Sequence, residues 1–152
     1  MELEHLIALR DAYIQNLALL IKTRGIRIVR WSRRLFRIFK EYLEVAGNHN
    51  DIKTMKYCLE AVEEYLQISK PVVHLYSSII LFMLCKTLYN LSMSDCRDET
   101  RLETKKKTIY CIQLVLDQLP KSDRQQLKKN LSDKMSNDSQ CHKFFNILQS
   151  II

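Results

Sequence analysis

The residues of this chain best suited to binding chemistry are arginines gathered in one short segment. Residues 24–40 read RGIRIVRWSRRLFRIFK and carry six Arg and one Lys but no Asp or Glu. Their charge of +7 equals the net charge of all 152 residues. The planar guanidinium group of arginine pairs in a bidentate manner with carboxylates and phosphates. The segment therefore indicates a local surface that binds an anionic group.

Helical periodicity sorts this segment into a basic side and an apolar side. The basic residues recur at spacings of three and four, which places them along one side of a helix. Ile28, Trp31, Leu35 and Phe39 follow the opposite side, and we expect Trp31 to pack into the core there. The candidate partner-binding residues are Arg27, Arg30, Arg33, Arg34, Arg37 and Lys40.

Four sources of counter-charge are consistent with this basic side. Like charges one turn apart repel, at a cost of a few tenths of a kcal/mol for each pair. Glu60, Glu63 and Glu64 on the next predicted helix would neutralise it internally. An acidic segment of a partner protein, or the phosphates of a nucleic acid, would neutralise it from outside. A membrane-surface or calmodulin-target helix has a similar pattern, but we expect the bundle to cover its apolar stripe.

Patterns typical of catalysis or metal binding are not found in the sequence. The four His and five Cys residues include no CxxC motif and no cluster with the spacing of a closed zinc site. Only two glycines are present, so neither a GxSxG nucleophile turn nor a glycine-rich phosphate loop is available. We expect no enzyme activity, no cofactor and no metal. We also expect His74 to be a buried core histidine and His49 to be exposed in a loop.

Cysteine usage and hydropathy bear on the compartment. The cysteines are odd in number and widely spaced, which is typical of reduced, buried thiols. The first residues are acidic, unlike a secretory signal. The most apolar run, residues 72–85, is shorter than the ~20 residues that a membrane-spanning helix needs. We expect an intracellular protein, nuclear or cytoplasmic, with no transmembrane segment.

The elements that position these residues are predicted to be helices only. Two glycines and two prolines in 152 residues are too few for the turns of a β-rich fold. We predict a single all-α domain over 1–152, an irregular bundle of six or seven helices. A loop lies near 93–100 and a linker near 136–139. The expected helices are residues 2–23, 26–46, 51–69, 71–93, about 100–119, 123–134 and 139–151, and the helix over 71–93 is expected to be the most buried.

Two stretches of the chain are loosely similar to α-hairpin repeats of the tetratricopeptide kind. In each, a helix, a short polar break and a second helix end at a proline, first Pro71 and then Pro120. These prolines are 49 residues apart, whereas the tetratricopeptide repeat has a period of about 34 residues. The irregular bundle is therefore the main prediction, and α-hairpin stacking remains open as its alternative.

These observations favour a non-enzymatic interaction domain, an adaptor or scaffold that binds a protein partner with an acidic segment through the face over 24–40. The alternative is a nucleic-acid-binding helical domain that uses the same face. The last predicted helix has an apolar side at the end of the sequence, which suggests a homo-oligomer or partner contact. Its residues are Phe144, Leu148, Ile151 and Ile152.

Overall fold

The computed structural model describes residues 2–92 and 98–135, and within these ranges every regular element is a helix. The predicted all-α class is therefore confirmed. In chain order the elements are α1 (Glu2–Arg24), η1 (Gly25–Trp31), α2 (Ser32–Asn48), α3 (Ile52–Ile68), η2 (Val73–Leu75), α4 (Ser77–Ser92), α5 (Glu99–Asp117) and α6 (Lys121–Met135), where η denotes a 3-10 helix.

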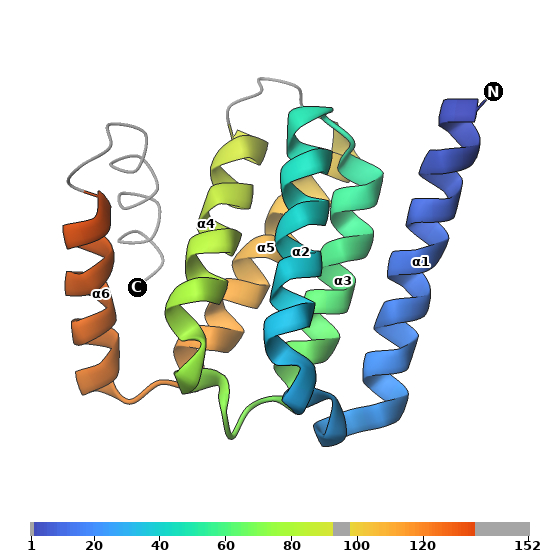
Figure 1. The fold of residues 1–152 in the computed structure, drawn as a ribbon. Coiled ribbons are helices and arrows are strands. Elements are labelled where there is room, and N and C mark those ends of the chain that lie inside the picture. Colours follow the sequence, from blue (N-terminus) through green and yellow to red (C-terminus); the bar gives the residue numbers. More distant parts are fainter. Residues whose placement is uncertain (1, 93–97, 136–152) are drawn as a thin grey trace.

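The α-helices pack in two layers (Figure 1). Helix α3 lies between α1 and α5 in one layer, and α4 lies between α2 and α6 in the other. Across the layers, α2 packs on α3 and α4 packs on α5, so successive hairpins stand side by side. This is the stacking that the α-hairpin alternative describes, although the chain has no 34-residue repeat.

Fewer helices pack together in the described part of the chain than were predicted for the whole of it. Within residues 2–92 and 98–135, the five helices α1 to α5 pack against one another, whereas the prediction was six or seven. Helix α6 lies beside α4 and buries Leu127. The predicted helix over 139–151 and the linker near 136–139 lie outside the described residues, as does most of the loop near 93–100.

Two of the predicted helices begin later than expected. Gly25 has φ of +59°, a left-handed conformation that ends helix α1. The seven residues that follow α1, Gly25–Trp31, form the 3-10 helix η1. Helix α2 therefore starts at Ser32 and not near residue 26. Likewise, residues 71–76 form a turn and η2, so α4 starts at Ser77. The prediction for His74 was wrong, because it lies in this turn and is exposed.

Helix α4 has one buried side and one exposed side, whereas the sequence suggested burial nearly all round. Ile80 and Leu84 are among its fully buried side chains, packed in the same core as Leu59 of α3 and Ile112 of α5. The neighbouring Ile79, by contrast, is 55% exposed. The exposed side of α4 therefore presents apolar surface outside the core.

Buried polar side chains fix how the hairpins meet. The Asp51 carboxylate accepts the Thr54 backbone N–H (3.2 Å) and so caps α3. The Thr54 hydroxyl is also 2.6 Å from a carboxylate oxygen of Asp11 in α1. Arg101 in α5 is buried and donates to the Leu91 carbonyl (3.2 Å) and to Oδ1 of Asn50 (2.5 Å). It thereby ties the end of α4 to the turn between α2 and α3.

Candidate functional site

The basic side chains of residues 24–40 are divided between two grooves. The first, which we call the α2–α4 groove, includes Arg33, Arg37 and Lys40 among its lining residues. The second, which we call the η1 groove, lies where α1, η1 and α2 meet and is lined by Arg24, Arg27, Arg30 and Arg34 together with apolar residues. All the predicted partner-binding residues are exposed, but they do not form the single stripe that a continuous helix would give.

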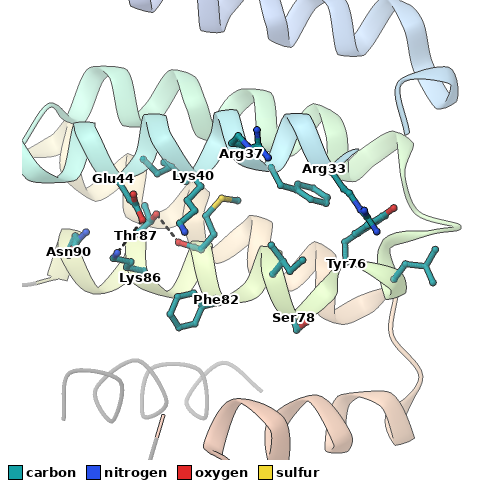
Figure 2. Close-up of a pocket in the computed structure, with 15 residues that line it drawn as sticks. Arg33, Arg37, Lys40, Glu44, Tyr76, Ser78, Phe82, Lys86, Thr87 and Asn90 are labelled. Carbon is teal, nitrogen blue, oxygen red and sulfur yellow. Dashed lines mark hydrogen bonds and ion pairs between the residues drawn. The ribbon is translucent and has the colours of Figure 1, made fainter. Parts of the chain in front are cut away.

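The α2–α4 groove has an apolar floor. Its volume is about 750 Å³, and Figure 2 shows it between α2 and α4. Phe36 from α2 and Met83 from α4 belong to the core and also reach the groove, while Phe82 lines it and is 37% exposed. The remaining lining residues are Arg33, Arg37, Lys40, Leu43, Glu44, Leu75, Tyr76, Ser78, Ile79, Lys86, Thr87 and Asn90.

The charged residues that line the α2–α4 groove are mainly cationic. Arg33, Arg37, Lys40 and Lys86 contribute four positive charges, and Glu44 contributes the one negative charge. Glu44 is 3.5 Å from the Lys86 ammonium group, a partly exposed pair that bridges α2 and α4 (Figure 2). The two arginines and Lys40 are in no ion pair with any described residue. Three positive charges thus remain over an apolar floor.

Internal neutralisation by Glu60, Glu63 and Glu64 was one of the alternatives for the counter-charge, and no ion pair between them and the basic segment occurs among the described residues. Glu63 pairs with Lys107 of α5 at 2.7 Å, within the layer that α1, α3 and α5 form and away from the α2–α4 groove. Neither Glu60 nor Glu64 forms an ion pair within the described part of the chain. Burial of the Lys107 ammonium group lowers its pKa, but the hydrogen bond and the charge of Glu63 outweigh this and leave the pKa raised. Glu63 therefore serves the contact between α3 and α5.

The η1 groove contains the tryptophan that the sequence placed in the core. Trp31 is 40% exposed, so that prediction was wrong. The guanidinium carbons of Arg30 and Arg34 lie 5.2 Å and 5.0 Å from the centre of its ring, in cation–π contact. The 3-10 helix explains the difference, because a tighter turn rotates the side chains of residues 25–31 away from the helical register.

Sequence reasoning missed the α4 half of the first groove. Ile79, Phe82 and Lys86 lie on a helix that looked apolar all round. One signal was available, because Ser78 and Lys86 are eight residues apart and so share a face with Phe82. A lysine on that face indicates that it reaches water.

The remaining predicted features carry no site among the described residues. Phe144, Leu148, Ile151 and Ile152 lie outside the described residues. His49 is exposed, as predicted. Among residues 2–92 and 98–135, no three His, Cys, Asp or Glu side chains are grouped so as to hold a metal ion. A search of the same residues finds no helix with the length and hydropathy to cross a membrane.

Three cysteine thiols are buried in the core. Cys58, Cys85 and Cys111 are free thiols with no access to water. Burial raises the pKa of all three, to about 12 for Cys85 and Cys111 and further for Cys58. Because the thiolate is the reactive form, these cysteines are unsuited to nucleophilic or redox chemistry at neutral pH.

No protein-family model, curated protein or solved structure matches this chain.

Proposed function

We propose that this protein is a non-enzymatic interaction module that binds an acidic, amphipathic helix of a partner protein in the α2–α4 groove. The observation that carries the proposal is the combination of an apolar floor with three unpaired cations at its edge. The three cations and the exposed side chains of the floor lie outside the core, and like charges repel one another across the groove, so these residues are better explained by binding than by folding.

The dimensions of the groove suit a helix. Its lining residues on α2 extend from Arg33 to Glu44, a distance of about 17 Å at ~1.5 Å per residue. That length matches about three turns of a bound helix, which would place side chains at i, i+3 or i+4, and i+7 along the floor. Leu75, Ile79 and Phe82 are the exposed apolar side chains that such anchors would contact.

The charges define the polar side of the partner. Glu or Asp residues beside the apolar anchors would pair with Arg33, Arg37 and Lys40 along the edge of the groove. Arginine favours such pairing because its planar group binds a carboxylate through two hydrogen bonds. The phosphate backbone of a nucleic acid would meet the same charges, but it has no aliphatic side chains to fill an apolar floor. The groove therefore favours a protein partner.

A displayed library of random helical peptides tests this proposal. We expect the peptides selected by the purified protein to be enriched in Glu and Asp and in apolar residues at helical spacing. Arg33→Glu with Arg37→Glu should weaken the selected peptides by at least tenfold, because two attractive charges become repulsive. Arg24→Glu with Arg27→Glu changes the net charge equally at the η1 groove, and this matched control should change the affinity by less than about threefold.

A second variant tests the contribution of the apolar floor to affinity independently of the charges. Phe82→Ala removes an exposed apolar contact and should lower the affinity of the same peptides by about fivefold or more without unfolding the domain. Selection of basic or patternless peptides would contradict the proposal, as would equal losses in the two charge-reversal variants. Salt-sensitive binding of DNA or RNA that Arg33→Glu with Arg37→Glu abolishes would favour the nucleic-acid alternative.

A further inference from the structure

A second surface lies at the bend of the chain between α1 and α2. Three large apolar side chains are exposed there: Leu20 (44%), Ile26 (56%) and Trp31 (40%). Ile26 lies outside the η1 groove, whereas Leu20 and Trp31 line it. The exposed apolar side chains thus extend beyond the groove. The bend between α1 and α2 that carries them lies at the lower end of the fold in the view of Figure 1.

The same surface is strongly basic. The η1 groove has a volume of about 810 Å³, and its charged lining residues are Arg24, Arg27, Arg30 and Arg34, with no Asp or Glu. The rest of its lining is apolar, with Leu17, Leu20, Ile28, Trp31 and Leu35. A ligand that complements this surface must be both anionic and aliphatic.

Helix α1 continues the apolar surface along its length. Leu6, Leu9, Tyr13 and Leu20 are separated by three, four and seven residues, so they share one side of α1, and all are exposed. Their side is distinct from the one that Ile14 and Ile21 bury. This exposed apolar strip of α1 lies next to the basic residues of η1, and apolar side chains beside a cluster of cations are the combination that binds at a membrane interface.

We propose that the η1 groove, Ile26 and the exposed side of α1 dock onto a membrane surface rich in anionic phospholipids. In this arrangement Leu20, Ile26 and Trp31 enter the boundary between headgroups and acyl chains, where tryptophan is favoured. The four arginines bind lipid phosphates around them. The expectation that the bundle covers the apolar stripe holds for Ile28, Leu35 and Phe39 but not for Trp31, and Ile26 of η1, which is not part of that stripe, is exposed as well.

A nucleic acid fits this surface less well. The Trp31 ring is in contact with two guanidinium groups, which compete with a base for stacking on it. A nucleic acid also supplies no alkyl group for the aliphatic side chains of the groove, whereas an acyl chain does. The lipid surface satisfies both the charge and the apolar area.

The single tryptophan of the chain makes the proposal directly testable. The full chain is mixed with vesicles of phosphatidylcholine alone, or of phosphatidylcholine and phosphatidylserine at about 2:1. We expect co-flotation with the anionic vesicles only, a blue shift of Trp31 emission, and quenching by lipids brominated near the headgroup. Raised salt should weaken the binding, because the arginine–phosphate attraction is screened.

Matched variants locate the surface. Each arginine near an anionic membrane contributes about a fivefold gain in binding, so Arg24→Glu with Arg27→Glu should lower vesicle binding at least tenfold. Arg33→Glu with Arg37→Glu makes the same change in net charge at the other groove and should lower it less than threefold. Ile26→Ser should weaken binding and reduce the Trp31 blue shift, while the helical circular dichroism of each variant stays that of the wild type.

Three outcomes would overturn the proposal. The first is no flotation with anionic vesicles. The second is an equal loss in the two charge-reversal variants, which would indicate attraction by net charge alone. The third is binding of single-stranded DNA or RNA that is tighter than vesicle binding, that quenches Trp31 emission, and that is lost in the variant carrying Arg24→Glu and Arg27→Glu. Since the peptide experiment depends on the α2–α4 groove and the opposite variant pair, either proposal can fail while the other stands.

Discussion

Two adjacent isoleucines of α4 offer a matched test of how the fold divides core from surface. Ile80 is 1% exposed and Ile79 is 55% exposed, although the sequence pattern treats both as core residues. Ile80→Ala removes three buried carbon groups worth about 0.8 kcal/mol each and leaves a cavity. We expect it to lower the free energy of unfolding by ~3–4 kcal/mol.

The same substitution at the neighbouring position should be nearly neutral. Ile79 already has about half of its surface in water, and alanine is a better helix former by a few tenths of a kcal/mol. We therefore expect Ile79→Ala to change the free energy of unfolding by less than about 1 kcal/mol. Because Ile79 lines the α2–α4 groove, this variant should instead lose affinity for groove-binding peptides.

Urea unfolding followed by helical circular dichroism measures both variants. At ~2–4 °C per kcal/mol for a chain of this size, Ile80→Ala should also lower Tm by roughly 6–16 °C. Equal losses in the two variants would refute the orientation of α4, because a helix buried on all sides would make both positions core. A larger loss for Ile79→Ala would show that α4 is rotated about its axis.

Four further predictions rest on the contacts described above. A triple variant with Arg30→Glu, Arg34→Glu and Arg37→Glu should keep its helical circular dichroism, and its Tm should stay within a few degrees of the wild type, since no described acid pairs with these arginines. A large fall in Tm would instead support neutralisation of the arginines by acidic residues of the chain itself. Arg101→Met should cost about 2–3 kcal/mol in urea unfolding, because the Leu91 carbonyl and Asn50 lose a buried donor, and a neutral result would argue against this contact. A thiol-reactive dye should leave the three buried thiols unlabelled in the native protein and label five in denaturant; a count of three or one there would reveal disulfides. The buried thiols have pKa values above their ordinary 9.0 in the folded state, so their contribution to stability is complete below pH ~9. It should decline as pH rises from about 9 to 12, by up to ~1.4 kcal/mol per thiol per pH unit, and no such decline would show that they are accessible.

The fold class follows from composition because scarce glycine and proline leave few breaks between helices. The cap at Asp51 is similarly local, since its carboxylate and the Thr54 amide are close in the chain. The start of α2 was harder to predict, because a short 3-10 segment carries apolar residues at spacings that an α-helix also uses. Only Gly25 with its positive φ separates the two cases.

The sequence predicted the α2 side of the α2–α4 groove but not its α4 side. Local charge identified Arg33, Arg37 and Lys40 as surface residues, because a run of cations without acids cannot be buried. Their neighbours Phe82 and Lys86 could not be found in this way, since they belong to α4 and depend on how it packs beside α2. Hydrophobicity indicates that a residue favours burial, but it does not indicate which neighbouring helix covers it.

If the α2–α4 groove binds an acidic helix, exchanging the charges of the groove and of the peptide should exchange which pair binds tightly. The measurement is the Kd of one selected acidic peptide, and of the same peptide with Lys in place of its acids, for the wild type and for Arg33→Glu with Arg37→Glu. We predict that the acidic peptide binds the wild type at least tenfold more tightly than the variant, and that the Lys peptide reverses this order. Equal affinities of each peptide for the two proteins would contradict the claim.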